Sequence, residues 1–193
     1  QKKWLTTNIV LEDKDWELSY SEQSQKLLNL HGIKIKDIYP NIEISKDRLN
    51  ELKKNIPYAG KKIAFGVDSF EDYKIWYEEN FIELANRLYD KGLFDYVYLI
   101  CGKDKQSFAK KIINKSKKNY FIDCSDLNLL DVMGALKDSN FFVGNNSGPL
   151  NLSAALNITS FGLFSNTPIS QLKFSKVIPL TPINYIDNQF IKN

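Results

Sequence analysis

The sequence has very few of the residues that build metal centres or common reactive sites. Its 193 residues include one histidine, two cysteines and one methionine. One histidine and two cysteines without metal-ligand spacing cannot build a credible zinc site. Cys101 and Cys124 lie at or near the ends of apolar stretches, so we expect buried thiols rather than a disulfide. His31 precedes Gly32 at the end of a helical pattern and is expected to lie at a helix C-terminus.

The sequence motifs of several enzyme classes are missing too. There is no Gly-x-Gly-x-x-Gly after an apolar strand, no Walker lysine loop and no Gly-x-Ser-x-Gly turn. A redox enzyme on a flavodoxin-like sheet is therefore the least supported alternative. No apolar run is long enough to span a bilayer.

The charge is close to balanced and does not favour nucleic acid as a partner. Lysine and arginine number 26 against 23 aspartate and glutamate, which gives a net charge of +3. Lysine pairs such as 110–111 and 117–118 are typical of solvated surfaces. A hydrophobic fraction of 43% is ample for a packed core. The charge does not exclude an acidic small molecule as a ligand.

From Lys61 onward, short apolar strands alternate with helical patterns. We expect strands over 63–67, 96–101, 120–123, 141–143 and 160–164. We expect helices over 76–90, 104–116, 127–137 and 149–156. This repetition predicts an α/β fold, a Rossmann-like parallel sheet with helices on both faces. In the common strand order 3-2-1-4-5, ligands bind in the crevice between the first and fourth strands.

The first 60 residues follow a different pattern, with helices expected over 21–30 and 46–55 and an extended linker between them. The chain begins with Gln1 rather than methionine, so we expect it to be part of a longer protein. The predicted organisation is an N-terminal segment with a linker, a sheet domain and a C-terminal extension, over 1–60, 61–170 and 171–193.

The most informative segment is Gly144-Asn145-Asn146-Ser147-Gly148-Pro149, between an apolar strand and a small-residue helix. The free N–H groups at such a helix start, with the positive end of the helix dipole, can hold a phosphate. The Ser147 hydroxyl can donate to phosphate oxygens, and Gly148 lets a ligand approach the backbone closely. An ordinary strand-to-helix connection would explain the loop equally well.

The loop after the first strand, 66–74, is the second polar, glycine-marked connection. Its Lys74 can reach over the crevice as a counter-charge for a diphosphate, although a solvated surface lysine is the alternative. Asp68 and Ser69 lie at the tip of the first strand, where they could contact the same ligand or simply cap a helix.

Polar residues also follow the second expected strand. Asp104 and Gln106 come shortly after Gly102, a position where nucleotide-binding sheets often hold ribose hydroxyls. Asp104 could equally cap its own helix. The sequence therefore predicts a nucleotide site along the carboxyl edge of the sheet, with anion binding as its main visible chemistry.

The loop and its surroundings resemble the signature of glycosyltransferase family 9, the lipopolysaccharide heptosyltransferases. Two segments carry this similarity, namely residues 143–156 and residues 161–168. Lys74-Ile75-Trp76 is similar to the Lys-x-Trp of that family, and the helix from Leu127 to Lys137 is similar to its Leu-rich helix. The resemblance covers most of residues 15–185.

This resemblance implies the C-terminal half of a GT-B fold, preceded by a remnant of the N-terminal acceptor domain in 1–60. The activity that it implies is inverting, metal-independent transfer of a sugar, first of all heptose from ADP-heptose, to a lipopolysaccharide or other cell-envelope acceptor. No cofactor is implied besides the donor. The catalytic base is expected in the missing domain. The resemblance implies a cytoplasmic location and is compatible with peripheral contact with the inner membrane.

The resemblance also implies roles for individual residues. The donor diphosphate would be bound by Lys74, Ser147, Gly148, Ser69 and Asp68. The donor sugar or nucleoside would be bound by Asn146, Asn151, Gln106 and Leu127.

Three positions depart from the family pattern. Asn146 replaces an aspartate, Asn151 replaces a histidine, and Gln106 stands where an acidic residue is frequent. Asparagine still forms hydrogen bonds to hydroxyls, so binding could survive the loss of charge. A non-catalytic nucleotide-sugar-binding module is therefore the alternative hypothesis.

Overall fold

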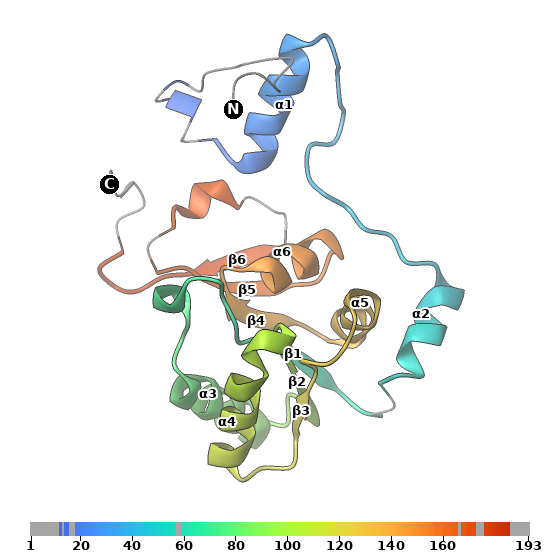
Figure 1. The fold of residues 1–193 in the computed structure, drawn as a ribbon, viewed down its shortest axis with the longest axis vertical. Coiled ribbons are helices and arrows are strands. Elements are labelled where there is room, and N and C mark those ends of the chain that lie inside the picture. Colours follow the sequence, from blue (N-terminus) through green and yellow to red (C-terminus); the bar gives the residue numbers. More distant parts are fainter. Residues whose placement is uncertain are drawn as a thin grey trace.

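The computed structural model describes residues 12, 14–15, 18–56, 59–165, 167–172 and 176–185. Its centre is a six-stranded parallel sheet of order β3-β2-β1-β4-β5-β6 (Figure 1). The strands are β1 (Lys62–Gly66), β2 (Tyr96–Ile100), β3 (Phe121–Asp123), β4 (Phe142–Asn145), β5 (Ser160–Leu163) and β6 (Val177–Leu180). The predicted strands and their order 3-2-1-4-5 are confirmed.

The strand β6 was not predicted, and it lies in the segment that was expected to be a C-terminal extension. This strand is short, half-exposed to exposed, and contains Pro179, so it lacks the continuous buried run of the inner strands. Proline cannot donate to a sheet ladder and is tolerated on an edge strand, which is where β6 lies.

Each predicted helix is present. The helices are α1 (Tyr20–Leu30), α2 (Lys46–Lys53), α3 (Glu78–Asp90), α4 (Gln106–Ser116), α5 (Leu129–Asp138) and α6 (Gly148–Ala155). Among the described residues, 3₁₀ turns include η3 (Asp72–Lys74), η4 (Lys103–Lys105) and η5 (Ile169–Gln171). The helix α5 begins two residues later than predicted, because the side chain of Asn128 accepts the N–H of Asp131 and caps it there.

Helices cover both faces of the sheet, as the strand pattern predicts. Neighbouring side chains of a strand point to opposite faces. In β1, Ile63 and Phe65 pack in one core with α3 and α4, whereas Ala64 packs in a second core with α5 and α6. The strands are therefore apolar on both faces because each face has its own helical layer.

The helix α2 packs against α5, although it lies in the segment 1–60. Leu52 is buried, and a Cβ atom placed on Gly134 would lie 2.8 Å from the Leu52 Cβ. The amide of Asn55 donates to Asp131 at 2.8 Å, and Asp138 pairs with Lys53 at 2.7 Å. Several independent contacts therefore hold α2 on the sheet domain. The proposed domain boundaries themselves stay a prediction.

The helix α1 lies apart from the sheet, on the side of α6 (Figure 1). It has no buried residue, and a capping box between Ser19 and Glu22 stabilises its start. His31 is its C-cap, as predicted. An extended segment joins α1 to α2, and within it the N–H of Ile42 donates to the carbonyl of Ala155 at 2.8 Å.

Both cysteines are free and buried, as predicted. Burial raises the pKa of each thiol to about 12, so neither is a thiolate nucleophile at neutral pH. In the described part of the chain, no helix combines the length and apolar character needed to cross a membrane.

The contact between α3 and α4 includes a carboxylate with two cationic partners. Glu78, the first residue of α3, is 5% exposed. Lys111 pairs with its Oε1, and the Nζ of Lys115 lies 2.8 Å from the same oxygen. The hydrogen bonds from Lys111 and then Lys115 lower the pKa of Glu78 from 4.5 to about 2.

We expect Gly134→Ala to destabilise the fold by about 1–2 kcal/mol, because the added methyl forces α2 away from α5. This loss outweighs the gain of about 1 kcal/mol in helix propensity. Chemical denaturation measures it. Gly148→Ala is the matched control, since its added Cβ would meet no other part of the chain within 4 Å beyond its own helix backbone and sequence neighbours. Equal stability of Gly134→Ala and the wild type would contradict the packing of α2 on α5.

We expect Glu78→Gln to lower the free energy of unfolding at pH 7 by roughly 1–2 kcal/mol, because the variant loses the attraction of two lysines. The loss is no larger because Lys111 and Lys115 are partly exposed, and solvent screens their charges. The folded pKa lies below the unfolded one, so this stabilisation is complete above about pH 4.5 and fades toward pH 2. Denaturation at several pH values should show the difference between variant and wild type shrinking over that range. Glu83→Gln, which breaks only the exposed pair with Arg87, should have little effect.

Candidate functional site

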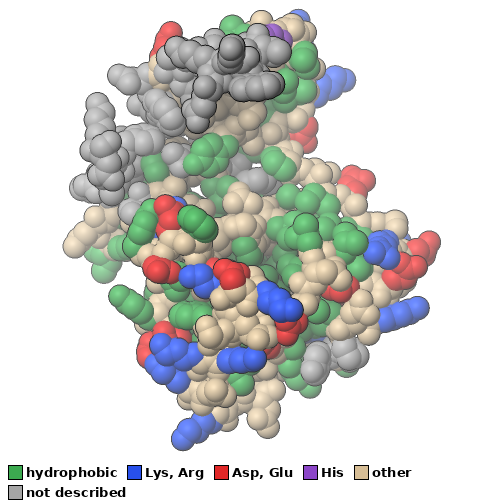
Figure 2. All heavy atoms as spheres, in the orientation of Figure 1, with side chains coloured by type: hydrophobic (Ala, Val, Ile, Leu, Met, Phe, Trp, Pro, Cys, Tyr) green, Lys and Arg blue, Asp and Glu red, His purple; other side chains and the backbone are tan. Residues whose placement is uncertain are grey.

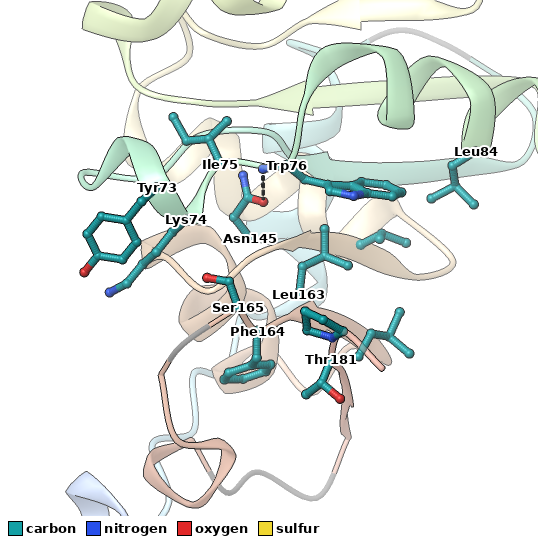
Figure 3. A pocket seen from close by; sticks show the side chains of 13 residues that line it. Tyr73, Lys74, Ile75, Trp76, Leu84, Asn145, Leu163, Phe164, Ser165 and Thr181 are labelled. Carbon is teal, nitrogen blue, oxygen red and sulfur yellow. Dashed lines mark hydrogen bonds between the residues drawn. The ribbon is translucent and has the colours of Figure 1, made fainter. Parts of the chain in front are cut away.

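The carboxyl ends of β1 and β4 lie side by side at the point where the sheet order reverses. The register pairs Gly66 with Gly144, so the loops that follow these residues leave the sheet together. The loops are joined by a hydrogen bond of 3.0 Å from the backbone N–H of Trp76 to the Oδ1 of Asn145 (Figure 3). The helix α3 begins at Glu78 rather than at the predicted residue 76, because the backbone of its N-cap residue Tyr77 is extended, with ψ of 149°.

Asn145 is the most constrained polar residue of this region. It is completely buried at the end of β4. Its Oδ1 accepts from Trp76, whereas its Nδ2 has no hydrogen-bond partner in the described part of the structure. An unsatisfied buried donor costs about 1–3 kcal/mol, which native proteins seldom accept without a reason. Asn145 belongs to the glycine-bounded motif of the sequence, but no role was predicted for it, although a polar residue that ends an apolar strand is a usable signal.

The segment after Asn145 leads into α6 as predicted, but the side chains of Ser147 and Asn151 already form hydrogen bonds to nearby backbone carbonyls. Ser147 is the N-cap residue, and its hydroxyl donates to the Asn145 carbonyl at 3.3 Å rather than pointing to an empty site. The amide of Asn151 donates to the Ser147 carbonyl at 3.1 Å. Gly148 is exposed, with no atom near a Cβ placed on it, so a ligand can reach the backbone there. The backbone N–H of the half-buried Asn146 donates to the Leu163 carbonyl at 3.1 Å.

Lys74 lies at the end of the turn η3, where it is paired rather than free. Its Nζ forms an ion pair with Glu71, and its side chain is 18% exposed. The hydroxyl of Tyr73 donates to the other oxygen of Glu71 at 2.6 Å. Hydrogen bonds from Lys74 and then Tyr73 lower the pKa of the Glu71 carboxyl. The pairing of Lys74 with Glu71 was not predicted from the sequence.

A cavity of about 510 Å³ opens beside these two loops. Its polar lining comes from Lys74, Asn145, Ser165 and Thr181, and its apolar lining includes Trp76 (Figure 3). The residues 146–148 do not line this cavity. The structure therefore brings Lys74 together with the end of β4, while the exposed start of α6 lies just after it in the chain.

A second group of predicted residues meets at the ends of β2 and β3. Gln106 is the first residue of α4, and its amide donates to Asp126 at 2.8 Å. Leu127, next to Asp126, is half-buried against the core of α5 and α6. The loops after β2 and β3 are thereby held together, next to the loops after β1 and β4.

Asp68 and Ser69 lie between the two groups. The Asp68 carboxylate accepts the backbone N–H of Gly102 at 3.0 Å, which ties the end of β1 to the end of β2. Ser69 is 3% exposed. Asp68 thus has a structural contact that differs from the helix cap considered above. Ligand binding by either residue stays a prediction.

Charges of both signs are interleaved on the face drawn in Figure 2, which shows no broad patch of one sign. Within the described ranges, no three histidine, cysteine or acidic side chains gather where they could hold a metal ion. That the chemistry proceeds without a metal stays a prediction.

Solved structures with a similar fold include heptosyltransferases and a glycosyl transferase family 9 protein. ADP-heptose lps heptosyltransferase II of E. coli is 17% identical, with a TM-score of 0.75 over 91% of this chain and 57% of that one. A glycosyl transferase family 9 protein of Veillonella parvula is 16% identical, with a TM-score of 0.73 over 94% and 53%. E. coli heptosyltransferase WaaC with ADP is 21% identical, with a TM-score of 0.62 over 83% and 49%.

At these identities the likeness shows the fold, and it confirms a Rossmann-like half of the GT-B architecture. The chain spans about half the length of these proteins. No curated protein sequence matches the chain significantly. The sequence profile of glycosyltransferase family 9 (heptosyltransferase) matches residues 3–186. Because that match extends over nearly the whole chain, the protein belongs to glycosyltransferase family 9.

Proposed function

We propose that this chain is the donor-binding half of an inverting, metal-independent glycosyltransferase. The donor is a nucleoside-diphosphate sugar, with ADP-heptose as the first candidate. The acceptor is lipopolysaccharide or another cell-envelope glycan. The proposal includes a cytoplasmic location with peripheral contact to the inner membrane.

The observation that carries the proposal is the crevice between the ends of β1 and β4. Lys74 supplies an ammonium and Asn145 a buried amide donor to one cavity, and the accessible helix start at Gly148 follows Asn145 in the chain. Each of these groups favours an anionic oxygen. Two similar structures, of E. coli WaaC, were solved with ADP and with ADP-2-deoxy-2-fluoro heptose, which supports a nucleotide-sugar donor.

The proposed orientation of the donor follows the order of the loops. The diphosphate lies at the ends of β1 and β4, near Lys74 and Gly148. The nucleoside extends toward Gln106 and Leu127 at the ends of β2 and β3. Asn146 and Asn151 lie on the α6 side, where amide groups can bind sugar hydroxyls.

In the proposed reaction, the oxygen of an acceptor hydroxyl forms a bond to the anomeric carbon of the donor sugar. The bond from that carbon to the diphosphate oxygen breaks, and the nucleoside diphosphate leaves with the electron pair. The hydroxyl proton passes to a base outside this chain. The contribution of this chain is to stabilise the charge on the leaving group, through Lys74 and the N–H groups and dipole at the start of α6.

A non-catalytic nucleotide-sugar-binding module is the second candidate. Asn146 and Asn151 stand in place of the aspartate and histidine of the family pattern, and the Asn151 amide is bonded to its own helix. An assay on a longer protein that contains both domains would distinguish the two candidate functions. Release of nucleoside diphosphate from the donor supports the transferase, whereas donor binding without any turnover supports the module.

A thermal-shift panel of ADP-, GDP- and UDP-sugars tests donor binding. At about a hundredfold excess over Kd, the correct donor should stabilise the fold by about 2.7 kcal/mol. For a chain of this size, we expect the midpoint of thermal unfolding to rise by roughly 5 °C or more. We expect the largest rise with ADP-heptose. If none of the nucleotide sugars shifts the midpoint, the assignment of the crevice as a donor site is wrong.

We expect Lys74→Ala to weaken ADP binding by about 1–3 kcal/mol, which is about 5- to 150-fold in Kd, because a charge-assisted hydrogen bond is lost. Isothermal titration calorimetry measures the change. Lys118→Ala is the control, since it removes the same charge from an exposed position outside the crevice. An unchanged Kd for Lys74→Ala would remove this lysine from the site.

A further inference from the structure

An exposed carboxylate lies after the end of β3, beside the proposed position of the nucleoside. Asp126 belongs to the turn that follows this strand, and the N–H of Leu127 closes the turn by donating to the Cys124 carbonyl at 3.2 Å. Cys124 and Ser125 are buried and Leu127 is half-buried, so the core holds the turn on both sides of Asp126. The Asp126 side chain itself is 65% exposed, so a ligand can reach it.

The amide of Gln106 fixes this carboxylate beside the end of β2. The Gln106 Nε2 donates to the Asp126 Oδ2 at 2.8 Å. The Gln106 Oε1 accepts from the Nζ of Lys110, one turn further along α4, also at 2.8 Å. Both ends of the amide are therefore bonded within the protein, and the acceptor that this pair offers to a ligand is the Asp126 carboxylate.

The second oxygen of Asp126 keeps its capacity to accept hydrogen bonds. The Nζ of Lys103 lies 3.6 Å from the Asp126 Oδ1, which is too far for a hydrogen bond, and the Lys103 side chain is 85% exposed. An ionised carboxylate accepts hydrogen bonds but never donates one. Asp126 therefore suits a ligand group that offers hydroxyls and disfavours one that offers phosphate oxygens.

The carboxylate of Asp104, on the connection after β2, has a different environment. A Cβ placed on Gly102 would lie 2.5 Å from the Asp104 Oδ1 and 3.6 Å from the Asp68 Oδ2, so Asp104 folds over the backbone at the strand end. Within the described structure it forms no hydrogen bond to Gln106. Asp104 therefore has the same charge as Asp126 in a neighbouring loop, without the amide that holds Asp126 in place.

We propose that Asp126 binds the ribose hydroxyls of the donor and makes the site specific for a ribonucleoside, with Gln106 as its positioning residue. The inference rests on the proposed function, because it assumes that the crevice binds a nucleoside diphosphate. In other nucleotide-binding sheets a carboxylate that binds ribose follows the second strand. Here the carboxylate follows β3, and the Gln106 amide holds it at the end of β2. Its negative charge also repels phosphate, which favours the orientation with the diphosphate at Lys74.

The test compares ADP with 2′,3′-dideoxy-ADP by isothermal titration calorimetry on the 193-residue chain. We expect wild type to bind ADP at least about tenfold more tightly, since the dideoxy nucleotide offers no hydroxyl to the carboxylate. Asp126→Asn should lower this ratio by about three- to tenfold, through weaker binding of ADP, as expected for the loss of an exposed charge-assisted hydrogen bond. Asp104→Asn is the matched control and should leave the ratio unchanged. Thermal unfolding of each variant checks that it is folded.

An exchange of the two side chains tests the positioning role of Gln106. Gln106→Ala keeps the carboxylate but removes the amide that holds it, so the ratio should fall by about two- to threefold, as expected when binding must order one more side chain. In the double variant Gln106→Glu/Asp126→Asn, the amide and the carboxylate change places. We expect the ratio to return to within about twofold of wild type, because one carboxylate and one amide again face each other. If the exchange restores nothing, the positioning role is wrong.

The remaining outcomes separate this inference from the proposed function. If wild type binds ADP and Lys74→Ala weakens it, but Asp126→Asn leaves the ratio unchanged, the role of Asp126 is wrong and the donor site stands. An equal fall of the ratio in Asp104→Asn shows an effect of charge alone and also overturns the role of Asp126. If wild type binds neither nucleotide, the donor site itself is wrong, and the inference fails with it.

Discussion

The parallel pairing of β1 with β4 is the constraint on which the crevice depends. It joins strands that lie more than 70 residues apart and sets Gly66 opposite Gly144. Neither glycine carries a Cβ, and an atom placed there on Gly144 would lie 2.7 Å from the Gly66 carbonyl oxygen. The two backbones can therefore approach at the edge where both loops begin. The hydrogen bond from Trp76 to Asn145 then fixes the loop that follows β1 to the end of β4.

The crevice is organised by polar contacts that leave few groups free. Glu71 holds Lys74, the Asn145 carbonyl accepts the Ser147 hydroxyl, and Asp68 connects two strand ends. These contacts give the ligand-free loops a defined shape, which reduces the ordering cost of binding. They also mean that a ligand must exchange partners with the protein rather than fill vacant positions. The buried amide of Asn145 is the exception, since its donor has no such partner in the described structure.

Much of the fold could be predicted from local pattern, and the reasons for the errors are specific. The inner strands are continuous apolar runs because helices cover both faces, so 63–67 and 96–101 were recognisable. The edge strand β6 was not, since one partner and a proline give it a mixed pattern. The contact of α2 with α5 was also missed. It depends on Leu52 meeting Gly134, a pairing of distant positions that no local period reveals.

By itself, the sequence determined the alternation of strands and helices, the strand order and the edge at which the polar loops gather. These follow from hydrophobic periodicity, turn residues and the handedness of parallel crossovers, all of which act over short stretches of chain. Only the tertiary structure decided which polar groups face one another. Trp76 and Asn145 are 69 positions apart, and their bond exists because two strands pair in one register. Even the near neighbours Glu71 and Lys74 form their pair only because the chain turns between them.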